Sequence, residues 1–386
     1  MGSGSAMDDI DYSVREALAV RAFTDAVPPE YKIGEGVFCK VVDHRKLPLK
    51  LAVTVDGVGT KTAVATMMRK YDTIGIDLVA MNQNDLDADP GNGNVEPFLF
   101  LDYLSLQADI ESDERIMSDL GKGVAEGLRQ ADASDVMRTY VRPSMIAGET
   151  ASEDEVVTGP RRGYGFGMAA AMIGLLEKNR YGIKIPEVGD VIVGFRSSGV
   201  HCNELTACRT KLLKPFYEPR PDFRGRYTGR YELGDKIPGT DTTIGEALLT
   251  PTLIYSKSLV EIAEELFTEH NTGFVGVHIT GYGIKNINRV GKFVRYCIDE
   301  PLQRQPIFDL VQEESGFSEE EMERKFNRDM GFAVIVNPSY VDLVITKAKL
   351  YGFDARYVGR VIENASEVPS VVVNRRGGSV SFQGYQ

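Results

Sequence analysis

The segment DGVGTK stands out in this chain because its residue types could hold a phosphate group and a metal ion. It begins at Asp56 and places a carboxylate before two glycines, Gly57 and Gly59, which precede Thr60 and Lys61. Glycines let backbone N–H groups approach an anion, a carboxylate can bind Mg²⁺, and an ammonium group can neutralise phosphate oxygens. The segment is not a Walker A loop, which has Gly directly before its Lys. We expect either a phosphate–metal site or an Asp-Gly turn with a solvated lysine.

Further oxygen ligands follow within a predicted helix. Asn82 and Asp85 are three residues apart, so they share one helical face, and Asn84 lies beside them in the sequence. Oxygen ligands grouped in this way suit a hard cation such as Mg²⁺. Glu149, in the segment GETA, follows an apolar run and is a third candidate carboxylate.

The acidic residues Asp85, Asp87 and Asp89 alternate as they do in a calcium-binding EF-hand loop. Such a loop requires glycine at the position where this chain has Pro90, and no exiting helix is predicted after it. We therefore interpret Asp87 and Asp89 as parts of a solvated acidic loop.

Two of the four histidines lie in glycine-bearing turns of the second half. His201 belongs to the segment SSGVHCN, and His278 begins the segment HITGYG. Such turns suit an anion-binding nest with a titratable neighbour. The alternative is that each histidine is satisfied by local hydrogen bonds.

The elements that must position these residues follow a mixed α and β pattern. A predicted strand over residues 51–55 runs directly into the glycine turn and so delivers Asp56. Apolar residues at Ile74, Leu78 and Met81 predict a helix that ends near Asp85. The remaining predicted elements are strands at 99–101, 165–176 and 190–194 and helices at 252–268 and 339–351.

The length of 386 residues indicates two domains. A polar stretch that ends in a proline places the boundary near residue 178, giving a first domain over 8–178 and a second over 179–386. The last twenty residues are expected to form a mobile tail with one strand. Residues 1–7, rich in Gly and Ser, are interpreted as a leader left by cloning.

Composition excludes several classes of protein. A net charge of −12 disfavours broad nucleic-acid binding, which needs a basic surface. No run of about 18 apolar residues is present, so a membrane span is not expected. The four cysteines are too few for a disulfide framework, which favours free thiols in the reducing cytoplasm.

A series of short segments, taken in order over about residues 33–363, points to a known family. The segments are DGVGTK, DTIGIDLVAM, NDL, EP with FLDY, GETA, SSGVHCN, LTPTLIY, HITGYG and FN. The ordered series resembles the AIR (aminoimidazole ribonucleotide) synthetases, which are phosphoribosylformylglycinamidine cyclo-ligases.

The resemblance implies a fold and a reaction. In the family, the sheet of an N-terminal αβ domain joins that of a second copy to form the barrel of a homodimer, and a C-terminal αβ domain packs against it. ATP and a phosphoribosyl substrate lie between the domains. ATP activates the amide oxygen of formylglycinamidine ribonucleotide as an iminophosphate, a ring nitrogen attacks, and phosphate leaves as AIR forms.

The resemblance also implies roles for individual residues. His201 and His278 match two catalytic histidines, and Lys61 matches the lysine of the first motif. Lys40 stands near the substrate loop of the family. The metal positions correspond to Asp56, Asp85 and Glu149, and the nucleotide-binding positions to Asp56, Gly57, Gly59, Thr60, Lys61, Asn84 and Glu149.

Four positions depart from the family pattern: Ala147, Glu204, Tyr282 and Arg328. These departures affect the expected identity of the substrate more than the expected use of ATP. Two alternatives therefore stay open: another ATP-dependent enzyme of the superfamily, such as a thiamine-monophosphate kinase, and a non-catalytic ligand-binding homologue. A selenophosphate synthetase would need a reactive cysteine, for which Cys39 is the only candidate. The hydrogenase-maturation dehydratase would need a C-terminal cysteine, whereas this chain ends in GYQ.

Overall fold

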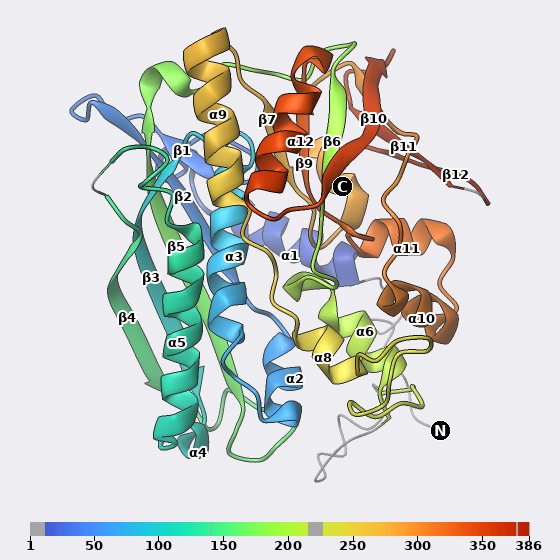
Figure 1. Ribbon diagram of the computed structural model, residues 1–386. Helices are drawn as coiled ribbons and strands as arrows, with labels where there is room; N and C mark the ends of the chain where they lie inside the picture. The colour runs from blue at the N-terminus through green and yellow to red at the C-terminus, as the bar shows by residue number, and fades with distance from the viewer. Residues whose placement is uncertain (1–11, 140, 215–226, 376, 386) are drawn as a thin grey trace.

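The structure is a computed structural model that describes residues 12–139, 141–214, 227–375 and 377–385. Two β-sheets lie side by side, and helices pack on both of them (Figure 1). Residues 1–7, interpreted above as a cloning leader, lie outside the described residues. Within the described part of the chain, no helix is long and apolar enough to cross a membrane.

The first sheet has five strands in the order β1-β2-β5-β3-β4, and all neighbours are antiparallel except β3 and β4. Helices α3 and α5 cover one of its faces (Figure 1). The strands are β1 (Lys40–Val42), β2 (Leu49–Gly57), β3 (Glu96–Leu106), β4 (Ser144–Ser152) and β5 (Phe166–Glu177). The helices of this half are α1 (Tyr12–Ala26), α2 (Lys61–Met68), α3 (Ile74–Asp87), α4 (Ala108–Glu111) and α5 (Glu114–Ala131).

Glycines allow α3 and α5 to pack backbone against backbone. A Cβ atom at Gly75 would lie 2.1 Å from the backbone nitrogen of Val124, and one at Gly123 would lie 2.7 Å from the carbonyl oxygen of Asp72. A Cβ atom at Gly127 would lie 2.8 Å from the side chain of Val79. Real Cβ atoms do not approach other heavy atoms so closely, because the core is packed at crystal-like density. These glycines therefore fix the distance between the two helices.

The second sheet has seven strands in the order β12-β11-β8-β10-β6-β9-β7. Helix α12 packs on β6 and β10, with α9 beside it. The strands are β6 (Val191–Arg196), β7 (Val275–His278), β8 (Val294–Ile298), β9 (Met330–Val336), β10 (Ala355–Glu363), β11 (Ser370–Arg375) and β12 (Gly378–Gln383). The helices are α6 (Leu205–Leu212), α8 (Ile244–Leu249), α9 (Ser256–His270), α10 (Pro306–Ser315), α11 (Glu319–Lys325) and α12 (Val341–Leu350). Short 3-10 turns complete the chain: η1 (Pro29–Tyr31), η2 (Lys178–Arg180), η3 (Cys202–Glu204), η4 (Gly283–Arg289) and η5 (Pro338–Tyr340).

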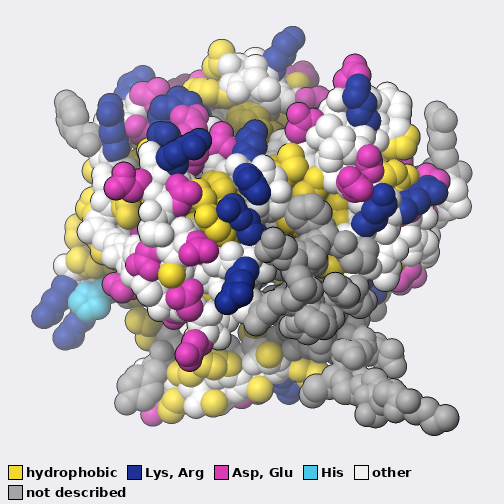
Figure 2. All heavy atoms as spheres, turned by 90° about the horizontal axis from the view of Figure 1, so that it is seen from below, with side chains coloured by type: hydrophobic (Ala, Val, Ile, Leu, Met, Phe, Trp, Pro, Cys, Tyr) yellow, Lys and Arg dark blue, Asp and Glu magenta, His cyan; other side chains and the backbone are white. Residues whose placement is uncertain are grey.

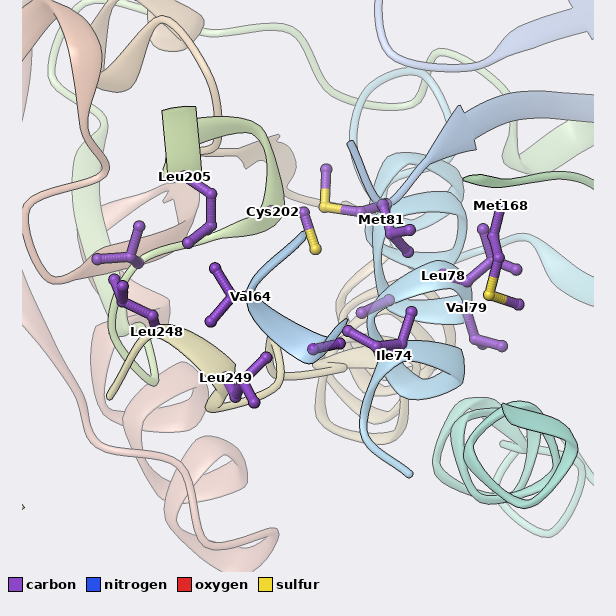
Figure 3. Packing of buried hydrophobic residues seen from close by; sticks show 14 of the residues in the cluster. Val64, Ile74, Leu78, Val79, Met81, Met168, Cys202, Leu205, Leu248 and Leu249 are labelled. Carbon is purple, nitrogen blue, oxygen red and sulfur yellow. The ribbon is translucent and has the colours of Figure 1, made fainter. Parts of the chain in front are cut away.

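One hydrophobic cluster joins the two halves of the chain. It contains Val64 and Met81 from the first half and Cys202 and Leu205 from the second, all buried. Figure 3 shows Val64 and Leu205 facing one another between α2 and α6. Because the residue next to His201 belongs to this cluster, the position of that histidine depends on the packing of α2 and α3.

The predicted elements agree with the structure except in three places. Helix α9 begins at Ser256, after the predicted start at residue 252, because the backbone of residues 252–255 bonds to side chains of α3 instead. The last twenty residues contain two strands, β11 and β12, paired antiparallel, so the prediction of one strand in a mobile tail is wrong. The third difference, the environment of Asp87 and Asp89, is described with the site. The chain passes between the sheets after Glu177 and before Val191, and the domain boundary near residue 178 stays a prediction.

Candidate active site

The turn between β2 and α2 carries the DGVGTK segment. Asp56 is the penultimate residue of β2, and its Oδ1 atom accepts a 2.6 Å hydrogen bond from the N–H of Gly57. A Cβ atom at Gly57 would lie 2.8 Å from the carbonyl oxygen of Met168, so only glycine fits beside the neighbouring strand. Gly59 has a φ of +52°, a left-handed conformation that glycine adopts readily. The Thr60 hydroxyl lies 3.2 Å from that of Thr206. The predicted strand and glycine turn are thus confirmed.

Lys61 differs from the prediction, because its ammonium group is committed to protein partners. Its Nζ atom lies 2.7 Å from Oδ2 of Asp77, and both side chains are completely buried. The same atom donates a 2.6 Å hydrogen bond to the carbonyl oxygen of Thr250. The other oxygen of Asp77 accepts from the N–H of Thr252 at 2.8 Å. These contacts link α2 to α3 and to the segment before α9, and a contact of Lys61 with phosphate stays a prediction.

Asparagines on α3 hold the neighbouring backbone in place. Asn82 lies 3.1 Å from the hydroxyl of Thr54 and donates to the carbonyl oxygen of Asp56 at 3.4 Å. Asn84 donates to the carbonyl oxygen of Leu253 at 2.8 Å and accepts from the N–H of Tyr255 at 3.3 Å. Both amide side chains are buried. The structure therefore places Asn84 as a link between the halves of the chain, and its contact with a nucleotide stays a prediction.

His278 and Asp85 form a pair across the two sheets. Nδ1 of His278, at the end of β7, lies 2.8 Å from Oδ1 of Asp85 on α3. The imidazole is buried, whereas the carboxylate is 20% exposed. Nε2 of His278 has no hydrogen-bond partner among the described residues. A carboxylate that accepts this hydrogen bond receives it from Nδ1, and in a neutral imidazole Nε2 then presents a lone pair. This arrangement orients a histidine that can accept a proton.

His201 lies next to this pair and is also buried. Its ring centroid is 5.8 Å from that of His278, and the backbone of Ile279 is a hydrogen-bonding neighbour of the ring. Burial, reinforced by His278 and Lys61, holds the pKa of His201 well below its ordinary value of 6.5, so the ring is neutral. A Cβ atom at Gly331 would lie 3.0 Å from the ring, so a small residue is needed there. A buried histidine with a depressed pKa beside a second buried histidine marks a candidate functional site.

Glu204 holds the backbone around His201. It accepts hydrogen bonds from the N–H groups of His201 at 3.1 Å and Asn327 at 2.6 Å. Burial raises the pKa of Glu204 well above 4.5, although these two N–H groups act in the opposite direction. The sequence marked Glu204 as a departure from the family pattern. In the structure, the buried Glu204 side chain links the backbone of the His201 turn to the segment before β9 through these two hydrogen bonds.

Asp87 and Asp89 are not in a solvated loop, which corrects the interpretation from the sequence. Asp87 is fully buried and accepts a 3.0 Å hydrogen bond from Nε2 of Gln83. Burial raises its pKa to about 7. Burial also raises the pKa of Asp89, which accepts from Asn92 at 3.2 Å. These residues pack because the end of α3 lies against β7, where Asp89 donates its N–H to the carbonyl oxygen of Gly276 at 2.9 Å.

Cys39 and Lys40 lie at the start of β1. Cys39 is buried, and burial together with Asp85 and Asp89 raises the pKa of its thiol. A thiol in this state is not a ready nucleophile, which argues against the selenophosphate synthetase alternative. Lys40 is exposed, and its ammonium group donates to the carbonyl oxygen of Gly36 at 2.6 Å. A catalytic role for Lys40 stays a prediction.

Glu149 lies away from the other candidate metal ligands of the chain. Glu149 is exposed on β4. Across the sheet, Glu149 pairs with Tyr103 of β3, Tyr103 pairs with Ala169 of β5, and Ala169 pairs with Gly57 of β2. Three steps of about 4.8 Å between strands put its backbone roughly 14 Å from that of Gly57. Across the described residues, no three side chains among His, Cys, Asp and Glu lie close enough to hold one metal ion. Metal binding by Asp56, Asp85 and Glu149 thus stays a prediction.

Several residues that shape the site could not be identified from the sequence. Asp77 lies in the segment DTIGIDLVAM, and only the fold shows that it is the buried partner of Lys61. Glu204 was noted only as a departure. Asn327 was quoted with the family motifs, yet its bonds to Ser197 and Glu204 depend on contacts that only the fold brings together.

Comparisons with known proteins place these features in a family. The description "AIR synthase related protein, N-terminal domain" matches residues 39–172, and "AIR synthase related protein, C-terminal domain" matches residues 187–372. The chain is similar to the phosphoribosylformylglycinamidine cyclo-ligase of Methanosarcina barkeri, with 35% identity over 84% of this chain and 83% of the relative. It is also similar to that of Pyrococcus horikoshii, with 32% identity over 92% of this chain and 94% of the relative.

Solved structures share the fold at much lower sequence identity. A HypE–HypF complex matches with a TM-score of 0.56 and 17% identity, over 95% of this chain and 98% of that one. AaThiL, complexed with AMPPCP and TMP, matches with a TM-score of 0.51 and 14% identity, over 98% of this chain and 99% of that one. The two-domain αβ fold expected from the sequence is confirmed. With both domains matched and relatives above 30% identity over most of its length, the chain belongs to the AIR synthase-related family of enzymes.

Proposed function

We propose that the protein closes the imidazole ring of AIR from formylglycinamidine ribonucleotide, with ATP converted to ADP and phosphate. The observation that carries this proposal is the His278–Asp85 pair with the neutral His201 beside it, in a chain whose relatives are named cyclo-ligases. The amide oxygen of the substrate attacks the γ-phosphorus of ATP, and the bond to the β-phosphate breaks. The open-chain nitrogen that becomes part of the ring then attacks the activated carbon, the C–O bond breaks, and phosphate leaves.

The hydrogen bond between His278 and Asp85 and the burial of His201 support the roles that we propose for the two histidines. The attacking nitrogen must lose a proton, and Nε2 of His278 presents a lone pair because Asp85 fixes the proton on Nδ1. His201 stays neutral beside it, so the two rings do not repel one another as two cations would. We assign His278 the proton transfer and His201 a polar contact with the phosphorylated substrate.

Asp56 and Asp85 suit magnesium bound together with nucleotide phosphates. Mg²⁺ usually takes one or two protein carboxylates and completes its coordination with phosphate oxygens and water, which suits a site where few protein ligands converge. The ion would neutralise charge on the transferred phosphate. We expect Asp85→Asn to weaken ATP binding at least tenfold in the presence of Mg²⁺ and little in its absence. Isothermal titration across a magnesium series checks this, and equal affinities at every concentration would contradict it.

The outer face of the first sheet supports a homodimer. Val55 is 74% exposed and Tyr103 is 42% exposed on the face away from the helices, and Ile146 is exposed on the adjacent edge strand. An apolar face of this kind on a soluble protein marks an interface. We propose that two copies cover this face for each other and that the dimer works in the cytoplasm, where its four free cysteines stay reduced.

The decisive experiment supplies ATP, Mg²⁺ and formylglycinamidine ribonucleotide to the purified chain. ADP, phosphate and AIR should appear in equal amounts, and ATP should persist when the ribonucleotide is omitted. Rapid ATP consumption with thiamine monophosphate would instead favour the kinase alternative. Binding of both ligands with no turnover would favour the non-catalytic homologue.

A further inference from the structure

A small internal cavity lies in the second half of the chain, apart from the histidine pair. Glu323, Asn327, Arg328 and Arg375 line it, together with apolar residues such as Met330. It offers about 20 Å³ of space for solvent. One water molecule needs roughly 10–15 Å³ on this measure, so the cavity has room for a single small particle and not for a phosphate or sulfate group.

The guanidinium group of Arg328 has hydrogen-bond donors left over at this cavity. Its side chain is 1% exposed, and Nη1 lies 2.7 Å from Glu319 and 3.1 Å from Glu323. Nε and Nη2 are buried with no hydrogen-bond partner among the described residues. An unsatisfied donor on a buried cation is costly, so a ligand that accepts hydrogen bonds is expected there.

The charges that line the cavity do not cancel. Arg328 and Arg375 are positive, and Glu323 alone is negative, with its Oε1 atom 2.5 Å from Nε of Arg375. Glu319 also faces Arg328, but it is 40% exposed and is shared with Arg304 at 2.9 Å. A water molecule would satisfy the donors without removing the excess positive charge. A small anion would do both.

We propose that this cavity binds one monovalent anion of the size of chloride, held between Arg328 and Arg375. Its consequence is local order in the segment that joins α11 to β9. Arg328 and Asp329 have φ angles of +43° and +83°, which are strained for residues with side chains. The anion fixes Arg328, and through the adjoining Asn327 it stabilises the hydrogen bonds that Glu204 accepts from Asn327 and His201.

Bromide is the probe, because it resembles chloride in charge and size and scatters X-rays anomalously. Crystals of the full chain grown in sodium bromide should show an anomalous peak between Arg328 and Arg375. In solution, bromide or chloride at constant ionic strength should raise the melting temperature of the wild type by roughly 2–4 °C relative to acetate, with saturation.

Two variants separate this site from general salt effects. Arg375→Gln should lose the halide response, since Arg375 is partly exposed and lines the cavity. Arg360→Gln is the matched control: Arg360 is 55% exposed, pairs with Asp299 on the same sheet, and does not line the cavity. The control should keep the full response. Absence of a bromine peak in the cavity would overturn the proposal, as would an equal halide response in Arg375→Gln and wild type. The wild-type diffraction measurement decides the matter even if Arg375→Gln does not fold.

Discussion

Replacing Lys61 by Met tests whether this lysine stabilises the fold or contacts phosphate. The substitution keeps a similar volume but leaves Asp77 fully buried, with Oδ2 lacking the 2.7 Å ion pair and only the N–H of Thr252 bonded to Oδ1. Removing one partner of a buried ion pair typically costs about 3–5 kcal/mol, because the other charge remains without compensation. We expect Lys61→Met to lower the stability by about that amount, measured by urea unfolding followed by circular dichroism.

A matched lysine provides the control for this experiment. Lys236 forms a 2.8 Å ion pair with Asp241, but their side chains are 61% and 101% exposed, so Lys236→Met should leave the unfolding midpoint nearly unchanged. The double variant Lys61→Met/Asp77→Leu removes both buried charges and should recover most of the lost stability. The reasoning fails if Lys61→Met unfolds at the wild-type midpoint while ATP turnover per folded molecule drops about a hundredfold. That result would assign the ammonium group to the phosphate.

Three further predictions concern the histidines and the assembly. His278→Gln should keep the melting temperature within a few degrees of the wild type, while turnover falls at least about tenfold because one positioned proton acceptor is lost. Normal turnover in a destabilised variant would instead give His278 a structural role. The depressed pKa of His201 means that the unfolded chain binds a proton that the folded chain does not, so stability is full above pH 6.5 and falls as the pH drops below it. Between pH 7 and pH 5 the wild type should lose about 2 kcal/mol more than His201→Gln in urea titrations, and identical slopes would contradict a neutral buried ring. Val55→Glu should convert a dimer into a 42.6 kDa monomer, measured by sedimentation at micromolar concentration. The control variant Val188→Glu, at a site in the second half that is 60% exposed, should remain a dimer. A monomeric wild type would refute the dimer itself.

The sequence predicts the local part of the site well. The strand, the two glycines and the carboxylate of Asp56 are adjacent in the chain, so alternation and turn chemistry suffice to place them. The pairing of His278 with Asp85 spans 193 residues, and no periodicity reports such a contact. The sequence marked both residues, but only the packing of α3 against β7 shows that they form one unit.

Burial explains the predictions that differ from the structure. A lysine after a glycine turn and alternating aspartates both resemble solvated surface, because charged residues are rarely buried. Lys61 and Asp87 are nevertheless fully buried, since the second half of the chain covers them with residues 250–256. The packing of the two halves of the chain decides which charged side chains are buried. Only the tertiary contacts show that packing.

The close approach of α3 and α5 extends the requirements for activity far beyond the residues that touch ligands. Gly75, Gly123 and Gly127 leave no room for even a methyl group, and α3 carries Asp85 toward the histidines. Any side chain at these positions must push α3 away from its neighbour and move Asp85 with it. Random mutagenesis selected for loss of activity should therefore yield inactive variants on the buried side of α5, with every chemical group intact.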